Sequence, residues 1–162
     1  MRESMAQLTG PFSANRAVRQ YTEEHYLPAA AAYRQRAADQ GAAGRQFVNW
    51  QQLLEQKWPM LGFGALKVSS DPNMHRFEIP VYLGSLDPDS IRVELYADGI
   101  AGSDAQRHAM TRGPQSADAN GAIYSTQIPA ARPAADYTVR IIPRCDGVAV
   151  PLEVNLILWQ QK

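Results

Sequence analysis

Cysteine and histidine are both scarce in this chain of 162 residues. Cys145 is the single cysteine, so no disulfide can form within the chain and no thiolate cluster can hold zinc or an iron–sulfur centre. The three histidines, His25, His75 and His108, lie far apart in sequence and share no metal-ligand spacing. We therefore expect no metal site, and the cysteine usage fits a reducing, cytoplasmic location.

Net charge and long apolar runs are also missing. Sixteen basic residues balance sixteen acidic ones, and no run of Lys or Arg supplies the positive surface that nucleic-acid binding requires. No stretch approaches the ~18 apolar residues of a membrane-spanning helix, and Met1–Ala6 lacks the apolar core of a signal peptide. The sequence predicts no nucleic-acid partner and no membrane segment.

The usual catalytic signatures are absent. The sequence contains no nucleophile elbow, Walker loop, dinucleotide-binding fingerprint, HExxH pair or CxxC pair. Its loop carboxylates lie near Pro and Gly, where such residues cap turns more often than they bind calcium; they are Asp87, Asp89, Asp98 and Asp104. We expect no catalytic residue on this chain.

The composition changes near Pro59. Residues 1–60 are rich in Ala, Gln, Arg and Glu, whereas residues 61–162 are rich in Val, Ile, Tyr and turn residues. Ser13 is predicted to cap the first helix, because its hydroxyl can accept a hydrogen bond from an unpaired N–H of the first turn. The domain prediction is a helical segment over 1–60 and a β-domain over 61–162.

One face of this first helix is mostly apolar. Ala14, Val18, Tyr21 and His25 follow one another at helical spacing and form a stripe that needs a packing partner. Left in water, such a stripe favours association, including self-association through the N-terminal helix.

Two breaks are predicted within the helical segment. Pro28 predicts a kink or break at Tyr26–Pro28, and Gly41–Gly44 predicts a helix stop. A third helical piece ending at Pro59 is indicated by apolar residues at helical spacing, namely Phe47, Trp50, Leu54 and Trp58.

Beyond Met60 the apolar residues alternate with a period of two, which is typical of half-buried strands. Ser70–Asn73 and Asp87–Asp89 have turn compositions. About seven short antiparallel strands with turn signals between them predict an immunoglobulin-like β-sandwich, so the fold class is mainly β with an N-terminal helical segment. The expected strands cover residues 63–68, 77–83, 91–97, 108–112, 122–128, 137–143 and 148–159.

Two hypotheses concern tyrosines on these strands. Tyr82 and Tyr96 are candidate glycan contacts, since the apolar face of a pyranose packs on an aromatic ring, although core packing explains them equally well. Tyr137 is predicted to form a tyrosine corner, in which its hydroxyl bonds back to the crossover after Ile128–Pro129.

The N-terminal segment resembles the last conserved stretch of bacterial α-glucan (glycogen/starch) phosphorylases, and its Phe-Ser-x-x-Arg core is the most specific element. The resemblance continues more loosely to the end of the chain, as the family's C-terminal extension. The matching segments are Met1–Thr9, Phe12–Tyr21, Tyr26–Pro28, Val93–Gly99, Met110–Gly113 and Asp136–Arg140.

The resemblance implies that residues 1–60 are the C-terminal end of a two-lobed GT-B glycosyltransferase core, and that residues 61–162 are an accessory sandwich. Complete enzymes of the family phosphorolyse α-1,4-glucan to glucose 1-phosphate, with pyridoxal phosphate held on a lysine. The resemblance assigns interlobe packing to the N-terminal residues Phe12, Ser13, Arg16, Val18 and Tyr21.

The cofactor-bearing and sugar-binding segments of the family lie upstream of what is present here, so none of their residues carries over. Lys57, Lys67 and Lys162 are the only lysines, and none has a Gly-rich or Ser/Thr-rich setting for a cofactor phosphate. Pyridoxal phosphate is expected in the complete enzyme and not on this chain. Met1 falls inside a longer family segment, which leaves a fragment and a separate gene product equally open.

Two functions from different classes follow. The first is a non-catalytic structural or assembly domain whose partner is the catalytic core of an α-glucan phosphorylase. The second is a carbohydrate-binding module that holds α-glucan through exposed aromatics. Independent catalysis by this chain is not expected, because no residue constellation supports it.

Overall fold

The structure is a computed structural model that describes residues 13–100, 102–115 and 121–161. The chain divides into two compact units, Met1–Asn49 and Trp50–Lys162. This boundary falls inside a helix and before the compositional change near Pro59, because the last turns of that helix belong with the strands. Leu54 in these turns is 1% exposed.

The first unit is helical. Helix α2 (Ala14–Tyr21) is followed by a π-helical turn, η1 (Thr22–Tyr26), and by helix α3 (Leu27–Lys57). The predicted cap is confirmed, since the Arg16 N–H donates to the Ser13 hydroxyl at 3.3 Å.

Of the kink or break predicted at Tyr26–Pro28, the break is wrong, because the helix continues past Pro28 through a π-helical turn. The Leu27 N–H bonds to the carbonyl of Thr22, five residues back instead of four. In a regular α-helix the Pro28 ring would meet the carbonyl of Glu24, and the wider π turn moves that carbonyl aside.

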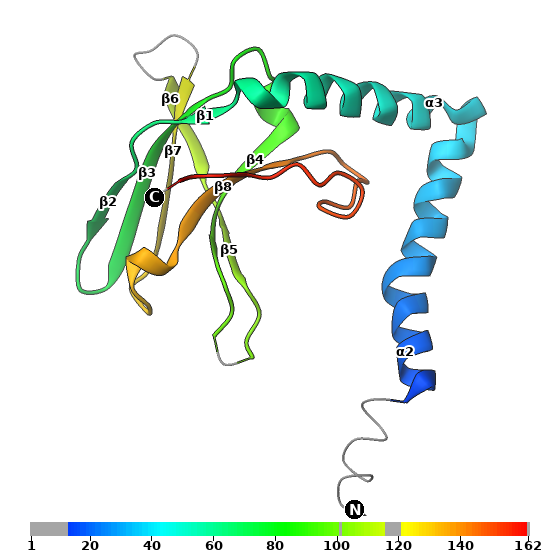
Figure 1. Cartoon of the computed structure of the whole chain (residues 1–162), viewed down its shortest axis with the longest axis horizontal. Coiled ribbons are helices and arrows are strands. Elements are labelled where there is room, and N and C mark those ends of the chain that lie inside the picture. The colour runs from blue at the N-terminus through cyan, green and yellow to red at the C-terminus, as the bar shows by residue number, and fades with distance from the viewer. Residues whose placement is uncertain (1–12, 101, 116–120, 162) are drawn as a thin grey trace, which may run out of the picture. The chain divides into compact units, whose positions relative to one another are not determined.

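The predicted stop near Gly41 is confirmed as a sharp bend inside α3 (Figure 1). Asp39, Gln40 and Gly41 take left-handed φ angles of 50°, 56° and 78°, which end the i to i−4 hydrogen-bond ladder. The Arg45 guanidinium donates to the Gln40 carbonyl at 2.6 Å and satisfies an acceptor at the bend. The described helical segment therefore has two long pieces and not three, with a single turn, η2 (Trp58–Met60), after them.

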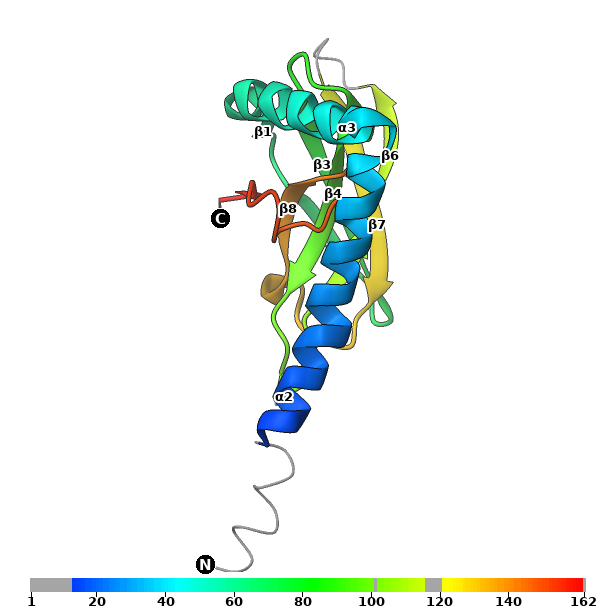
Figure 2. The ribbon, with the colours of Figure 1, turned by 90° about the vertical axis from the view of Figure 1, so that its right-hand side faces the viewer.

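The second unit is a β-sandwich, so the predicted fold class is confirmed. Figure 2 shows strands β7 and β8 on opposite sides of it. Sheet A has the order β1-β3-β7-β6 with β2 also pairing β3, and sheet B has the order β5-β4-β8-β9. The described strands are β1 (Gly62–Phe63), β2 (Lys67–Ser70), β3 (Met74–Tyr82), β4 (Ile91–Ala97), β5 (Gln106–Ala109), β6 (Thr111–Gln115), β7 (Gly121–Pro129), β8 (Thr138–Pro143) and β9 (Leu158–Trp159).

The period-two pattern places one face of each central strand in the core. Phe77, Ile79 and Val81 of β3 are at most 1% exposed, as are Val93 and Leu95 of β4. Each such side chain contributes about 1.5–3 kcal/mol by leaving water. The intervening residues point outward.

The described strands number nine and not seven, because two predicted strands are each divided. Residues 63–68 form parts of β1 and β2, which pair with different ends of β3. Residues 108–112 pass from sheet B to sheet A at Met110, whose N–H donates to the Val93 carbonyl at 2.9 Å. An alternating pattern records burial, and it does not record which sheet a strand joins.

The tyrosine-corner prediction is wrong. The Tyr137 hydroxyl donates to the side-chain oxygen of Gln106 on β5 at 2.7 Å, and not back to the crossover. The crossover is fixed instead by His75, which lies between the Ser70 hydroxyl at 2.7 Å and the Arg132 carbonyl at 3.0 Å. A carbonyl only accepts, so Nε2 of His75 donates to it and Nδ1 accepts from Ser70.

Substitution of Gly64 tests how tightly the edge of sheet A is packed. A Cβ on Gly64 would lie 2.9 Å from Cβ of Pro80, whereas a Cβ on Gly62 would meet only Tyr82, at 3.8 Å. Gly64→Ala is expected to lower the free energy of unfolding by about 1–3 kcal/mol, because the proline ring cannot rotate away. Urea denaturation measures the change, with Gly62→Ala as the matched control; equal losses for both variants would contradict the packing described.

Candidate functional site

A buried carboxylate organises the outer face of sheet B. Glu94 of β4, Arg140 of β8 and Trp159 of β9 are cross-strand partners in one row. Nε of Arg140 donates to Oε1 of Glu94 at 2.7 Å, and Nη2 donates to the same oxygen. Nε of Arg92 donates to Oε2 at 3.1 Å, so both carboxylate oxygens are engaged and Glu94 is only 2% exposed.

The Arg140 guanidinium also joins two aromatic rings. Its central carbon lies 4.2 Å from the ring centre of Tyr96 and 5.0 Å from that of Trp159. The two rings meet edge to face, with centres 5.3 Å apart and planes at 76°. Trp159 is thereby held by Arg140 on β8 and by Tyr96 on β4, and it remains 41% exposed.

The two predicted glycan contacts lie on different sheets. Tyr96 is half-buried against Arg140, and its hydroxyl donates to Asp98 at 2.9 Å, which raises the tyrosine pKa. Tyr82 lies on the outer face of sheet A, beside Gly62 of β1 and Gly121 of β7, which are its cross-strand partners. The two rings point away from the core on opposite sides of the sandwich and do not form a shared platform.

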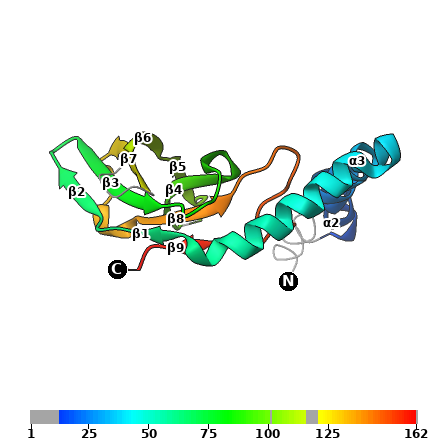
Figure 3. The ribbon, with the colours of Figure 1, turned by 90° about the horizontal axis from the view of Figure 1, so that it is seen from above.

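An uncharged hollow of about 260 Å³ is lined by residues of β1 and β9, edge strands of the two sheets, which Figure 3 shows from above. Trp159 forms part of its wall together with Phe63. The remaining lining residues are Leu61, Gly62, Gly64, Leu158, Gln160 and Gln161.

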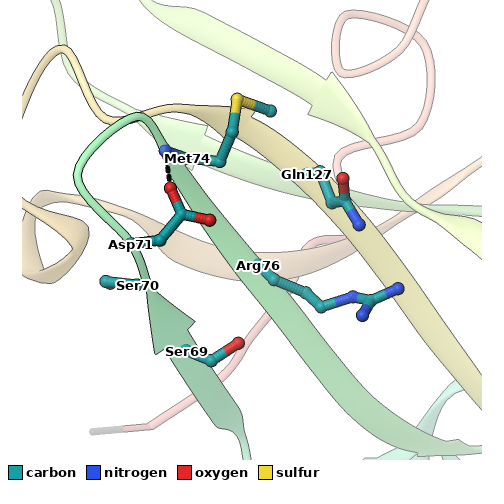
Figure 4. A pocket seen from close by; sticks show the side chains of 6 residues that line it. All are labelled: Ser69, Ser70, Asp71, Met74, Arg76 and Gln127. Carbon is teal, nitrogen blue, oxygen red and sulfur yellow. Dashed lines mark hydrogen bonds between the residues drawn. The ribbon is translucent and has the colours of Figure 1, made fainter.

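Two further hollows are charged. One lies on the outer face of sheet A, where Ser69, Arg76 and Gln127 form one cross-strand row and Asp71 closes the end (Figure 4). The backbone N–H groups of Asn73 and Met74 donate to Asp71, which lowers the pKa of its carboxyl.

The second charged hollow is lined by Asp89, Arg144, Cys145 and Asp146. It therefore contains the single thiol, with charged side chains around it.

The predicted interlobe residues lie on more than one helix face. Val18 is 63% exposed and Tyr21 is 57% exposed, and Tyr21 contacts the His25 ring, as the apolar stripe requires. Arg16 is two positions from Val18, which places it about 200° around the helix. Ser13 serves as the cap, and Phe12 lies outside the described residues.

Neither a metal cluster nor a membrane helix is found in the part of the chain that the structure describes. Those residues contain no group of three His, Cys, Asp or Glu side chains placed to hold a metal ion. Each helix among them is too short or too polar to cross a bilayer.

Comparison with known proteins identifies the family. The model of the glycogen phosphorylase C-terminal domain matches residues 64–161, and the chain belongs to this family. A glycogen phosphorylase from Mycobacterium tuberculosis is 26% identical over 97% of this chain, and a maltodextrin phosphorylase from Thermococcus litoralis is 25% identical over 99% of it. The chain spans 19% and 20% of the length of these curated relatives.

Sequence reasoning missed the Glu94 row, and it did not single out Trp159 from the other aromatic residues as a glycan contact. The available signal was a pair of opposite charges, Glu94 and Arg140, each at an outward position between apolar residues of a predicted strand. The pattern does not record which strands are neighbours, so contact between Glu94 and Arg140 could not be predicted.

Glu94 is expected to be the most costly charged residue to replace on the sandwich. Glu94→Gln leaves Arg140, whose side chain is 12% exposed, without its counter-ion, and is expected to cost about 3 kcal/mol of unfolding free energy. Chemical denaturation measures the loss.

The matched control is Glu78→Gln, because the Arg76–Glu78 pair spans 3.6 Å with side chains 56% and 42% exposed. This variant is expected to cost less than about 1 kcal/mol, since solvent screens an exposed ion pair. Similar costs for the two variants would contradict a special role of the buried carboxylate.

Proposed function

We propose that this chain is a non-catalytic accessory part of an α-glucan phosphorylase, which docks on the catalytic core through its N-terminal helical unit. The observation that carries this proposal is the apolar stripe of α2, which stays exposed in the part of the chain that the structure describes. Val18 and Tyr21 remain exposed, and no residue of α2 is buried. A helix of this length gains most of its stability from packing, which supports a missing partner surface.

The family assignment supports the nature of that partner. The relatives are named as glycogen and maltodextrin phosphorylases, and the chain corresponds to about a fifth of each. The remaining four-fifths of such a protein would supply the phosphorolysis of α-1,4-glucan, the pyridoxal phosphate and a cytoplasmic setting. The same stripe, without its core, would join two copies of this chain.

Docking is tested by complementation. A relative's phosphorylase that lacks the aligned segment is mixed with this chain, and release of glucose 1-phosphate from maltodextrin is followed. The wild-type chain is expected to raise the activity, and the double variant Val18→Ser with Tyr21→Ser to raise it less. The control, Arg19→Ser with Gln20→Ser, alters α2 away from the apolar stripe and should behave as wild type; a control that fails equally would refute docking through the apolar stripe.

Self-association is measured separately by sedimentation of the chain alone. We expect concentration-dependent oligomers that dissociate in the Val18→Ser, Tyr21→Ser variant, because that change removes the apolar contact. Oligomers that persist after deletion of residues 1–27 would assign the contact to another surface.

The absence of catalysis is also testable. The chain alone, incubated with maltodextrin, phosphate and pyridoxal phosphate, is expected to release no glucose 1-phosphate and to show no absorbance of bound cofactor. Activity together with bound cofactor in a pure sample, abolished by a point mutation, would overturn the non-catalytic assignment.

A second function, binding of glucan by the sandwich, is supported by one observation. Trp159 is a large aromatic side chain that is exposed, fixed in position and adjacent to an uncharged hollow. Exposed aromatic rings suit the apolar face of a sugar.

A further inference from the structure

We propose that the open edge of strand β2 pairs with the same strand of a second copy of this chain. The pairing is antiparallel and places Lys67 of each copy opposite Asp71 of the other, so that the two A sheets become one continuous sheet. The proposal does not rest on the docking of the helical unit, because β2 belongs to the sandwich.

Strand β2 is an exposed edge of sheet A. Among the described strands it pairs with β3 alone, and every residue of β2 is exposed, including Val68 at 46%. Figure 1 and Figure 3 both show β2 at the margin of the sandwich. An edge of this kind offers unpaired N–H and carbonyl groups to another strand, and a lysine on it discourages partners that lack a matching charge.

The hairpin turn after β2 decides which backbone groups face the open edge. The Asp71 N–H donates to the Met74 carbonyl at 3.0 Å, so these two residues form a hydrogen-bonded pair. Hydrogen-bonded and non-hydrogen-bonded pairs alternate along an antiparallel ladder. Ser69 therefore directs its backbone groups to β3, whereas Val68 and Ser70 direct theirs to the open edge. A second copy can pair there only through its own outward-facing residues.

Opposite charges favour one register of this pairing. When Val68 of one copy lies opposite Ser70 of the other, the two residues exchange both backbone hydrogen bonds, and the two-fold symmetry repeats the exchange. The same register places Lys67 opposite Asp71 of the second copy in a non-hydrogen-bonded pair. Side chains come closest in such pairs, and opposite charges there stabilise the sheet.

The neighbouring registers are less favourable. A slip of one residue would oppose outward-facing backbone groups with inward-facing ones. A slip of two residues in one direction places Lys67 opposite Ser69, so that the charges lose their partners. The same slip in the other direction places Val68 opposite Pro72, which has no N–H to donate. Only the register with Lys67 opposite Asp71 satisfies both the backbone and the charges.

Both charged side chains are available for the contact. Lys67 makes no ion pair with a described residue, and its cross-strand neighbour Glu78 contacts Arg76 instead. Oδ1 of Asp71 accepts the N–H of Asn73 at 2.9 Å and also that of the next residue, as Figure 4 shows for the latter. The second carboxylate oxygen, Oδ2, is left for the ammonium group of the incoming copy.

Strand β2 is ordered before it pairs. The Ser70 hydroxyl lies 2.7 Å from Nδ1 of His75, on the face of the sheet opposite to the charged side chains. Little freedom is lost on pairing, which favours affinity. The strand is nevertheless short and its ion pairs are exposed to solvent, so we expect a weak dimer with a Kd near ~1 mM.

The test is an NMR dilution series on the full chain carrying Val18→Ser and Tyr21→Ser, which removes association through the helix. From micromolar to millimolar concentration, we expect the amide signals of Val68 and Ser70 to shift and their exchange with solvent to slow. In a mixture of labelled and unlabelled chains, we expect an isotope-filtered NOE between the α-protons of Ser69 in the two copies, because these protons face each other in a non-hydrogen-bonded pair.

Three variants separate the backbone from the charges. Val68→Pro removes an outward N–H and keeps the ladder to β3, so it is expected to abolish the concentration-dependent shifts. Lys67→Glu opposes two carboxylates and is expected to weaken the dimer about tenfold. Asp71→Asn keeps the acceptor of the turn, removes the charge and is expected to weaken the dimer about threefold.

The matched control is Arg107→Glu, which makes the same charge change as Lys67→Glu on β5, an exposed edge strand of the other sheet. It is expected to leave the Kd unchanged. Thermal melts check the folding of each variant, and Lys67→Glu keeps the test valid if Val68→Pro does not fold.

Three results would overturn the proposal: no concentration-dependent shift at Val68 and Ser70, an unchanged Kd in a folded Val68→Pro variant, or equal Kd values for Lys67→Glu and Arg107→Glu. If Val68→Pro weakens complementation of the truncated phosphorylase while dilution leaves the β2 signals unmoved, the open edge docks on the catalytic core and self-pairing is refuted. Self-pairing by a chain that fails to complement would refute the docking alone and support this contact.

Discussion

The pairing of Glu94 with Arg140 is the interaction on which the outer face of sheet B depends. A carboxylate this deeply buried is tolerated only when its charge is balanced and its oxygens are hydrogen-bonded, and two guanidinium groups meet both conditions. The same Arg140 then fixes Tyr96 and Trp159. Because β9 consists of only Leu158 and Trp159, its place at the sheet edge relies on side-chain contacts as well as on backbone pairing.

Local chemistry made the class of most elements predictable from the sequence, whereas residues 148–157, expected as a strand, form turns and irregular backbone before β9. The serine before α2, the glycine at the bend of α3 and the alternation in β3 and β4 each act within a few residues, so the pattern reports them directly. Two of the errors concern partners that are distant in sequence. Tyr137 finds Gln106 on another strand, and the segment around Met110 joins two sheets, and neither choice is recorded in local periodicity. The turn at Pro28 differs, because a proline clash has two solutions, a break or a wider turn.

The candidate sites likewise depend on contacts between residues that are distant in sequence. The sequence suggested Tyr82 and Tyr96 as glycan contacts. In the structure Tyr96 packs against Arg140 on sheet B, and Tyr82 lies between Gly62 and Gly121 on sheet A. The exposed aromatic beside a hollow is Trp159, and its setting is formed by residues from β1, β4, β8 and β9. The N-terminal apolar stripe could be predicted because its residues follow one another at helical spacing within a single segment. Its partner could not, because a pattern within one helix does not record which surface covers it.

The passage of the chain from sheet B to sheet A at Met110 has a consequence for unfolding. Met110 is buried, with β5 immediately before it in one sheet and β6 immediately after it in the other, and its N–H is bonded to β4. One short, covalently continuous segment therefore takes part in both layers. Separation of the layers would have to strip this segment from one of them and expose the shared core, so the two sheets constitute one cooperative unit and not two independent ones.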